Sequence, residues 1–211
     1  MTPDPVQIGL EARDTGCDRA GAPIVRGVSF RLAPGEGLQL FGPNGSGKTS
    51  LLSLFAGLIA PAEGAINWTA EGATSARAPV NSIFFLGHDA GVKPALTAAE
   101  NLSFWAAGYG APTDAIDAAL DRVGARGLRD MRAGKLSAGQ KRRVDIARAV
   151  IANRPVWLLD EPAASLDASG DDMLRMLLND HFARGGIAVI ATHDDLGPGF
   201  ARLKLAAGAG A

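Results

Sequence analysis

The sequence contains a single cysteine, Cys17, among its 211 residues, so no disulfide can form within the chain. One free thiol is typical of a reducing compartment, and we therefore expect a cytoplasmic protein. No apolar run reaches the ~20 residues that a membrane-spanning helix requires, and the longest lies at 51–60. Residues 1–5 have neither a basic nor an apolar region, so we expect no signal peptide.

Neither sign of charge is in excess, because 21 lysine and arginine residues stand against 22 aspartate and glutamate residues, for a formal net charge of −1. A nucleic-acid-binding surface is usually basic, and a site for anionic lipids needs a polybasic run, which the sequence lacks. Any association with a membrane would therefore require a protein partner. The length suits one domain with a substantial core and a small insertion.

Apolar segments of strand length alternate with segments of helical periodicity, a pattern typical of an α/β fold with a mainly parallel sheet. A block of helices from about 95 to 152, opened by a capping-box pattern at residues 97–100, predicts a helical insertion in that core. A polar stretch at 14–23 predicts a turn between the first two strands. We predict strands at 6–12, 27–32, 37–41, 65–68, 82–86, 156–159 and 187–191, and further helices at about 48–59, 113–123, 138–152 and 168–183.

The strongest motif is a glycine-rich loop of the form G-x-x-x-x-G-K-[ST] between a predicted strand and a predicted helix. Glycines let successive backbone N–H groups point at phosphate oxygens, and the helix start adds a partial positive charge. Lys48 is placed to reach the β- and γ-phosphates of a nucleotide, and the Thr49 hydroxyl to hold Mg²⁺. A chance turn could match the pattern, but the strand-loop-helix context favours nucleotide binding. The motif consists of Gly42, Pro43, Asn44, Gly45, Ser46, Gly47, Lys48 and Thr49.

Two carboxylates, Asp160 and Glu161, follow the apolar strand at 156–159, at the end of a strand where ligand sites of α/β proteins lie. We expect Asp160 to bind Mg²⁺, directly or through water. Glu161 is placed to orient or deprotonate an attacking water. A strand that simply reaches solvent would look the same, so the catalytic interpretation depends on the glycine-rich loop.

The helix at 138–152 begins with a second capping-box pattern, in which Ser137 pairs with Gln140. By itself this pattern indicates only a well-capped helix, although free N–H groups at a helix start also suit an anion. Residues 136–140 resemble the L-S-G-G-Q signature of the ABC ATPases, with Ala138 in place of the usual first glycine before Gly139. The resemblance implies that this helix start binds the γ-phosphate of ATP held on the glycine-rich loop of a second subunit.

Other motifs extend the resemblance to the ABC ATPases. Residues 165–167 resemble the D-loop, which links two ATP sites, and His193 resembles the switch histidine, which implies contact with the γ-phosphate and stabilisation of transition-state charge. His88 stands where the family usually has a glutamine that senses Mg²⁺ and the membrane partner, so a coupling role and a plain surface histidine are both open. No aromatic residue precedes the loop at the usual place for stacking on adenine. Cys17 and Arg19 lie nearest, and an arginine could stack by a cation–π contact.

A narrower resemblance is carried by residues 86–93, which read L-G-H-D-A-G-V-K and are similar to a stretch in the ATP-binding subunits of cytochrome c maturation (haem exporter) systems. Residues 64–68 and 191–196 also resemble those subunits. The family implies a P-loop NTPase fold with a RecA-like, mainly parallel sheet core, a small N-terminal antiparallel β part and an inserted helical subdomain. Residues 1–211 would form one nucleotide-binding domain.

The same resemblance implies ATP and Mg²⁺ as ligands, a homodimer, integral membrane partner subunits and a peripheral location at the cytoplasmic face of the inner membrane. We therefore expect an ATPase that powers haem export, or release of a haem chaperone, in cytochrome c biogenesis. Another small ABC exporter is the alternative. A soluble ABC-type mechanoenzyme usually has two nucleotide domains or long coiled-coil arms, which the sequence lacks. A metabolic P-loop kinase would leave residues 136–140 and His193 unexplained.

Overall fold

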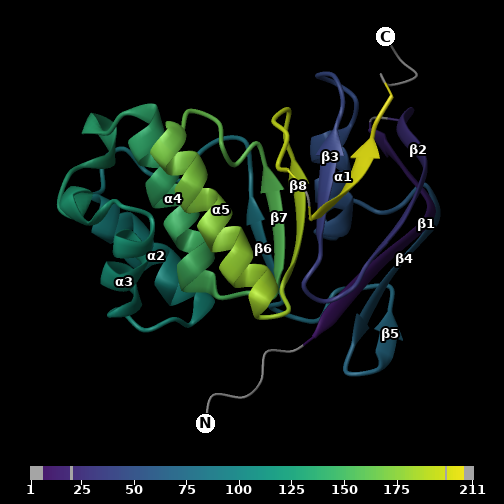
Figure 1. The fold of residues 1–211 in the computed structure, drawn as a ribbon, viewed down its shortest axis with the longest axis horizontal. Helices are drawn as coiled ribbons and strands as arrows, with labels where there is room; N and C mark the ends of the chain where they lie inside the picture. The colour runs from purple at the N-terminus through teal and green to yellow at the C-terminus, as the bar shows by residue number, and fades with distance from the viewer. Residues whose placement is uncertain (1–6, 20, 198, 207–211) are drawn as a thin grey trace. The chain divides into compact units, whose positions relative to one another are not determined.

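The computed structural model describes residues 7–19, 21–197 and 199–206, which fall into two compact units (Figure 1). The sheet unit lies within residues 1–85, 154–161 and 180–211, and the helical unit comprises residues 86–153 and 162–179. Helix α5, Ala168–Ala183, passes from the helical unit into the sheet unit. In the described residues, no helix combines the length and the apolar content that crossing a membrane requires.

The N-terminal part of the sheet unit is an antiparallel sheet, as the family resemblance implied. Its strand order is β2-β1-β4-β5, with β1 at Ile8–Arg19, β2 at Ala22–Leu32, β4 at Glu63–Ala70 and β5 at Ala73–Ser75. The predicted turn at 14–23 is wrong, because β1 continues to Arg19. Register shifts between Ala12 and Asp18 absorb the polar stretch within the strand, and the buried Thr15 hydroxyl donates to the Ala65 carbonyl at 2.9 Å.

The second sheet of this unit is mainly parallel, as predicted. Its strand order is β6-β7-β8-β3-β9, and the pairs β7–β8, β8–β3 and β3–β9 are parallel. The strands are β6 (Ile83–Leu86), β7 (Val156–Asp160), β8 (Ile187–Ala191), β3 (Gly37–Phe41) and β9 (Phe200–Lys204). Strand β9 was not predicted, because it lies at the sheet edge and is largely exposed, without an apolar run.

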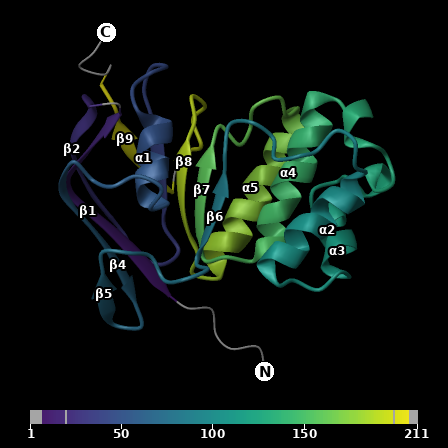
Figure 2. The same cartoon turned by 180° about the vertical axis from the view of Figure 1, so that it is seen from behind.

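Helix α1, Lys48–Phe55, packs between the two sheets of the sheet unit (Figures 1 and 2). Its buried leucines join a core that includes Leu38, Leu158 and Val189, which lie in register across three parallel strands. Burying each such side chain contributes about 1.5–3 kcal/mol. The helix ends earlier than predicted, since Gly57 takes a φ of 72° just beyond it.

The helical unit contains α2 (Ala98–Tyr109), α3 (Ala115–Arg122), α4 (Ala138–Ala152) and two short 3₁₀ helices at Arg126–Leu128 and Ala133–Lys135. Both predicted capping boxes are confirmed, at Thr97 with Glu100 and at Ser137 with Gln140. The predicted helical subdomain is therefore present, in a unit that also includes residues 162–179. That residues 1–211 act as one nucleotide-binding domain stays a prediction.

His181, near the end of α5, is a buried titratable group of the sheet unit. Its ring stacks on Trp157 with the centroids 4.1 Å apart, and its Nε2 lies 3.0 Å from the Ile187 carbonyl oxygen. Only 3% of the residue is exposed. Burial lowers the pKa of His181 from 6.5 to about 4, because the charged imidazolium would lose its hydration.

We expect this histidine to make the fold sensitive to mild acid. Between about pH 6.5 and pH 4 the unfolded chain binds a proton at His181 and the folded chain does not, so lowering the pH should reduce the free energy of unfolding by about 3 kcal/mol. Urea denaturation of wild type and His181→Gln across this range measures the effect. An equal pH dependence in both proteins would contradict the assignment.

Candidate functional site

The glycine-rich loop connects β3 to α1 and leaves the start of that helix uncapped. Gly47 occupies the N-cap position with a φ of 94°, and no side chain caps the helix. A Cβ atom at Gly47 would lie 2.3 Å from Cγ2 of Val25, so both the backbone angle and the space require glycine. The first-turn N–H groups of α1 lack intrahelical acceptors, which makes them suitable donors to an anion.

Lys48 is buried inside this loop, with 8% of its surface exposed. Its Nζ donates to the carbonyl oxygen of Gly42 at 2.8 Å and to that of Pro43 at 3.3 Å. In the part of the chain that the structure describes, no carboxylate forms a salt bridge with Lys48. A buried ammonium group without a carboxylate partner favours binding of an external anion.

Thr49 and Asp160 meet although 111 positions separate them in the sequence. The Thr49 hydroxyl donates to Oδ2 of Asp160 at 2.7 Å, and Asp160, at the end of β7, is 3% exposed. A hydroxyl and a carboxylate are ligands that suit Mg²⁺. The described residues contain no cluster of three or more acidic, histidine or cysteine side chains that could hold a metal ion. The pair therefore fits an ion that takes its other ligands from nucleotide phosphates and water.

Glu161 and His193 lie beside each other at the same edge of the sheet. His193 Nε2 is 3.4 Å from Oε1 of Glu161, 3.0 Å from Oδ1 of Asn44 and 3.5 Å from Nζ of Lys48. The Glu161 side chain is 20% exposed and the His193 side chain 51%. Glu161 has a φ of 47°, a conformation that costs about 1 kcal/mol or more outside glycine and is frequent at functional sites.

The start of α4 in the helical unit is joined closely to residues 165–167. The capping box is closed by two backbone–side-chain bonds between Ser137 and Gln140, of 2.9 and 3.2 Å. A Cβ atom at Gly139 would lie 2.5 Å from the Ser165 carbonyl oxygen, whereas Ala138 is exposed and tolerates its methyl group. Arg143 on α4 donates to Asp167 at 2.8 Å. Residues 136–140, which resemble the ABC signature, and residues 165–167, which resemble the D-loop, thus form one cluster.

A buried charge network on α4 was missed by the sequence reading. Arg142 donates to the Pro162 carbonyl at 3.1 Å and to the Gly87 carbonyl at 3.1 Å. Asp145, fully buried, accepts a hydrogen bond from Arg148 and forms an ion pair with Arg142 at 3.5 Å. Charged residues three positions apart within an apolar helix pattern were the available signal. The network joins the loop at 87–91 to the loop that follows Glu161.

Four further residues lie outside these clusters. His88 is exposed, and its coupling role stays a prediction. Trp105 donates through Nε1 to the Gly91 carbonyl at 3.2 Å, and Arg148 lies over its ring at 3.8 Å, so Trp105 packs within the helical unit. Cys17, one of the two residues nearest the usual position of the adenine-stacking aromatic, is fully buried. The side chain of Arg19 lies outside the described part of the structure.

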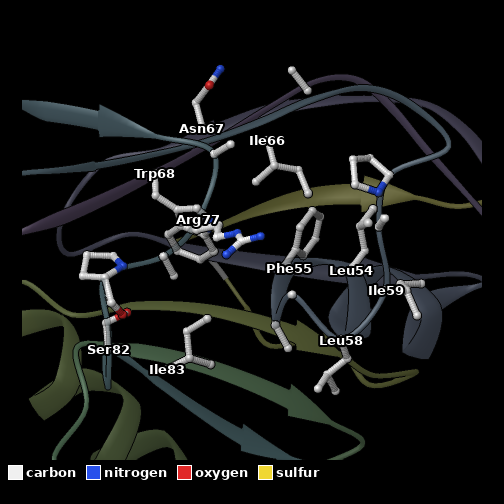
Figure 3. Close-up of a pocket in the computed structure, with 18 of the residues that line it drawn as sticks. Leu54, Phe55, Leu58, Ile59, Ile66, Asn67, Trp68, Arg77, Ser82 and Ile83 are labelled. Carbon is white, nitrogen blue, oxygen red and sulfur yellow. The ribbon is translucent and has the colours of Figure 1, made fainter.

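A separate groove of about 1010 Å³ lies in the sheet unit (Figure 3). It is lined by the end of α1, by β4 and by residues 76–83, with Phe55, Leu58 and Trp68 among its apolar side chains. Arg77 is the one charged residue in the lining, and no residue of the glycine-rich loop contributes. The groove is therefore separate from the glycine-rich loop.

Comparison with known proteins decides the family. The family model described as ABC transporter matches residues 25–164, which is more than half of the chain and includes the glycine-rich loop, the signature-like residues and Asp160. The chain belongs to the ABC transporter ATP-binding proteins. It is thus an ATP-binding subunit with the ATPase activity of that class, and it works with membrane partner subunits.

Relatives with a narrower description are similar over nearly the whole chain. The cytochrome c biogenesis ATP-binding export protein CcmA of Rhodopseudomonas palustris (strain BisB5) is 43% identical, over 95% of this chain and 99% of that protein. CcmA 2 of Cupriavidus metallidurans is 46% identical, over 95% and 97%. A solved structure, a putative ABC transporter ATP-binding protein from Pyrococcus furiosus, has a TM-score of 0.79 at 26% identity, covering 93% of this chain and 97% of that one.

The contact at Gly139 gives a prediction for this ABC ATPase. Alanine normally stabilises a helix relative to glycine by about 1 kcal/mol, but Gly139→Ala should destabilise the chain by about 1–3 kcal/mol, because the new methyl group meets the Ser165 backbone. Ala138→Gly, the matched control, should cost no more than about 1 kcal/mol. Thermal unfolding of the two variants checks this, and a stabilised Gly139→Ala protein would refute the contact.

Proposed function

We propose that this chain is the ATP-hydrolysing subunit of an exporter in cytochrome c biogenesis, where it powers haem export or release of a haem-loaded chaperone. The observation that carries the proposal is its similarity to CcmA proteins, at 42–48% identity over most of the chain. We place it, with the integral membrane proteins of cytochrome c maturation, at the cytoplasmic face of the inner membrane as a peripheral subunit.

In this proposal the sheet unit binds the ATP phosphates and positions the water that attacks the terminal one. The residues from Gly42 to Thr49 surround the phosphates, with Lys48 neutralising their charge. Thr49 and Asp160 would hold Mg²⁺, which when bound offsets the negative charge of the β- and γ-phosphates. Glu161 orients the attacking water and accepts its proton. His193, which lies 3.4 Å from Glu161, donates to the γ-phosphate as charge develops there.

The active form is a homodimer in which two chains enclose two ATP molecules. Ser137, Ala138, Gly139 and Gln140 of one chain would bind the γ-phosphate held by the other, because this helix start carries N–H groups and a partial positive charge. Arg142 ties the loop at 87–91 to the loop after Glu161. This connection supports a route by which a conformational change after hydrolysis is transmitted to His88 and to the membrane partner.

The roles assigned to Glu161 and to the dimer are tested together. Glu161→Gln keeps the size of the side chain but cannot accept a proton, so we expect ATP hydrolysis to fall at least about a hundredfold while ATP binding persists. The variant should accumulate as an ATP-dependent dimer in size-exclusion chromatography with light scattering. Normal turnover would remove Glu161 from its role, and a monomer with bound ATP would contradict the sandwich dimer.

The proposed use in cytochrome c biogenesis is tested in cells that lack the protein. We expect loss of c-type haem in a haem stain, restored by wild type and not by Lys48→Ala, since removal of the ammonium group weakens phosphate binding. Glu71→Ala, an exposed turn residue outside the motifs, is a matched control that should restore the stain. Normal c-type haem in the deleted strain would assign the ATPase to another small exporter.

A further inference from the structure

Gln39 is a buried polar residue in the middle of the parallel sheet. It lies on β3, between β8 and β9, with 1% of its surface exposed. Its neighbours Leu38 and Leu40 belong to the apolar core around α1, so strand alternation places Gln39 on the opposite face, in register with Ile190. An apolar side chain would fill this position without the desolvation cost of a carboxamide, so packing alone does not account for the glutamine.

The carboxamide of Gln39 holds the backbone next to the switch histidine. Its Nε2 donates to the Asp194 carbonyl oxygen at 2.6 Å, across 155 positions of sequence. On the other side of His193, the Thr192 N–H donates to the Leu40 carbonyl at 3.2 Å. The Asp194 N–H also donates to the Thr192 hydroxyl at 3.1 Å. Both residues that flank His193 are therefore anchored on β3.

The ring of His193 depends on this backbone anchoring because little packing surrounds it. Its side chain is 51% exposed, and its ring nitrogen contacts only polar groups of Asn44, Lys48 and Glu161 among the described residues. A bound nucleotide would compete for those same polar groups. The position of the ring during catalysis would then be set mainly by the segment at 192–194.

We propose that Gln39 is a positioning residue for His193, which orients the histidine toward the γ-phosphate by fixing the Asp194 carbonyl. The inference rests on the catalytic role that the proposed function gives to His193. Gln39 itself lies within the sheet and does not touch the nucleotide motifs. Its effect should therefore fall on the rate of hydrolysis and leave ATP binding unchanged.

Gln39 contributes little to the stability of the folded protein. Oε1 of Gln39 is buried and accepts no hydrogen bond from the described residues, and an unsatisfied buried acceptor destabilises a folded protein. Gln39→Leu removes that atom, and the Asp194 carbonyl, in an exposed residue, can accept from water instead. We expect the unfolding temperature of Gln39→Leu to equal or exceed that of wild type, which separates the positioning role from a structural one.

The test is a double-mutant cycle on ATP hydrolysis by the purified full-length chain, with wild type, Gln39→Leu, His193→Ala and the double variant. Gln39→Leu should lower kcat about 3- to 10-fold, as expected for the loss of one hydrogen bond, with KM for ATP within about twofold of wild type. In the His193→Ala background, which should itself lose at least about tenfold in kcat, Gln39→Leu should have no further effect.

Ser82→Ala is the matched control, because the buried Ser82 hydroxyl also donates to a loop carbonyl of the same unit, that of Pro79 at 2.7 Å. It should leave kcat unchanged. An unchanged kcat in Gln39→Leu, or an equal loss with and without His193, would overturn the inference while the proposed function stands. Normal hydrolysis by His193→Ala would instead overturn the proposed role of His193, and the positioning role with it.

Discussion

The parallel register of β7, β8 and β3 is the constraint on which the nucleotide site depends. Asp160 and Leu40 both lie opposite Ala191, so the three strands end at one level of the sheet. Each strand then continues into a loop that carries part of the site. Thr49 and Asp160 can therefore form a hydrogen bond although their sequence separation is large. An antiparallel arrangement would place alternate loops at opposite edges of the sheet.

The segment from Glu161 to Asp167 runs from the end of β7 into the helical unit, and hydrogen bonds anchor both of its ends. Glu161 donates its N–H to the Ala191 carbonyl at 2.8 Å within the sheet unit. In the helical unit, Arg142 donates to the Pro162 carbonyl and Arg143 donates to the side-chain carboxylate of Asp167. Glu161 and Ser165 both have positive φ angles, 47° and 69°. These anchors offset the cost of conformations that few residues other than glycine adopt.

The parts of this protein that local sequence patterns encode could be predicted from the sequence. The glycine-rich loop, the two capping boxes and the helix at 138–152 depend on residues close together in the chain. Strand β1 was predicted too short, because register shifts allow a polar stretch to stay in a sheet. Strand β9 was missed, because an edge strand needs no apolar run. The residues of such a strand do not by themselves indicate which strand it will pair with.

The hydrogen bonds that Gln39 and Arg142 donate to backbone carbonyls could not be predicted from the sequence, for a different reason. Both side chains donate to backbone carbonyls, which every residue possesses, so no side-chain type at the other end marks the pair. Spacing rules identify candidate site residues, such as Lys48 and Asp160, because their side chains carry the proposed chemistry. They do not identify side chains that donate to backbone carbonyls. Such donors can be recognised only from the structure, which gives their burial and their distance to the carbonyl oxygen.

At three loops, a buried side chain donates to the backbone carbonyl next to a residue with a proposed function. The Asp194 carbonyl held by Gln39 adjoins His193, the Gly87 carbonyl held by Arg142 adjoins His88, and the Pro162 carbonyl held by Arg142 adjoins Glu161. In each case the anchored group is main chain, so the anchoring hydrogen bond does not use the polar atoms of the adjacent side chain. A side-chain-to-side-chain bond would fix the geometry equally well but would occupy the group that the chemistry needs. This arrangement explains why strongly polar residues are retained in the core of the sheet and on the buried side of α4, where apolar residues would pack at lower cost.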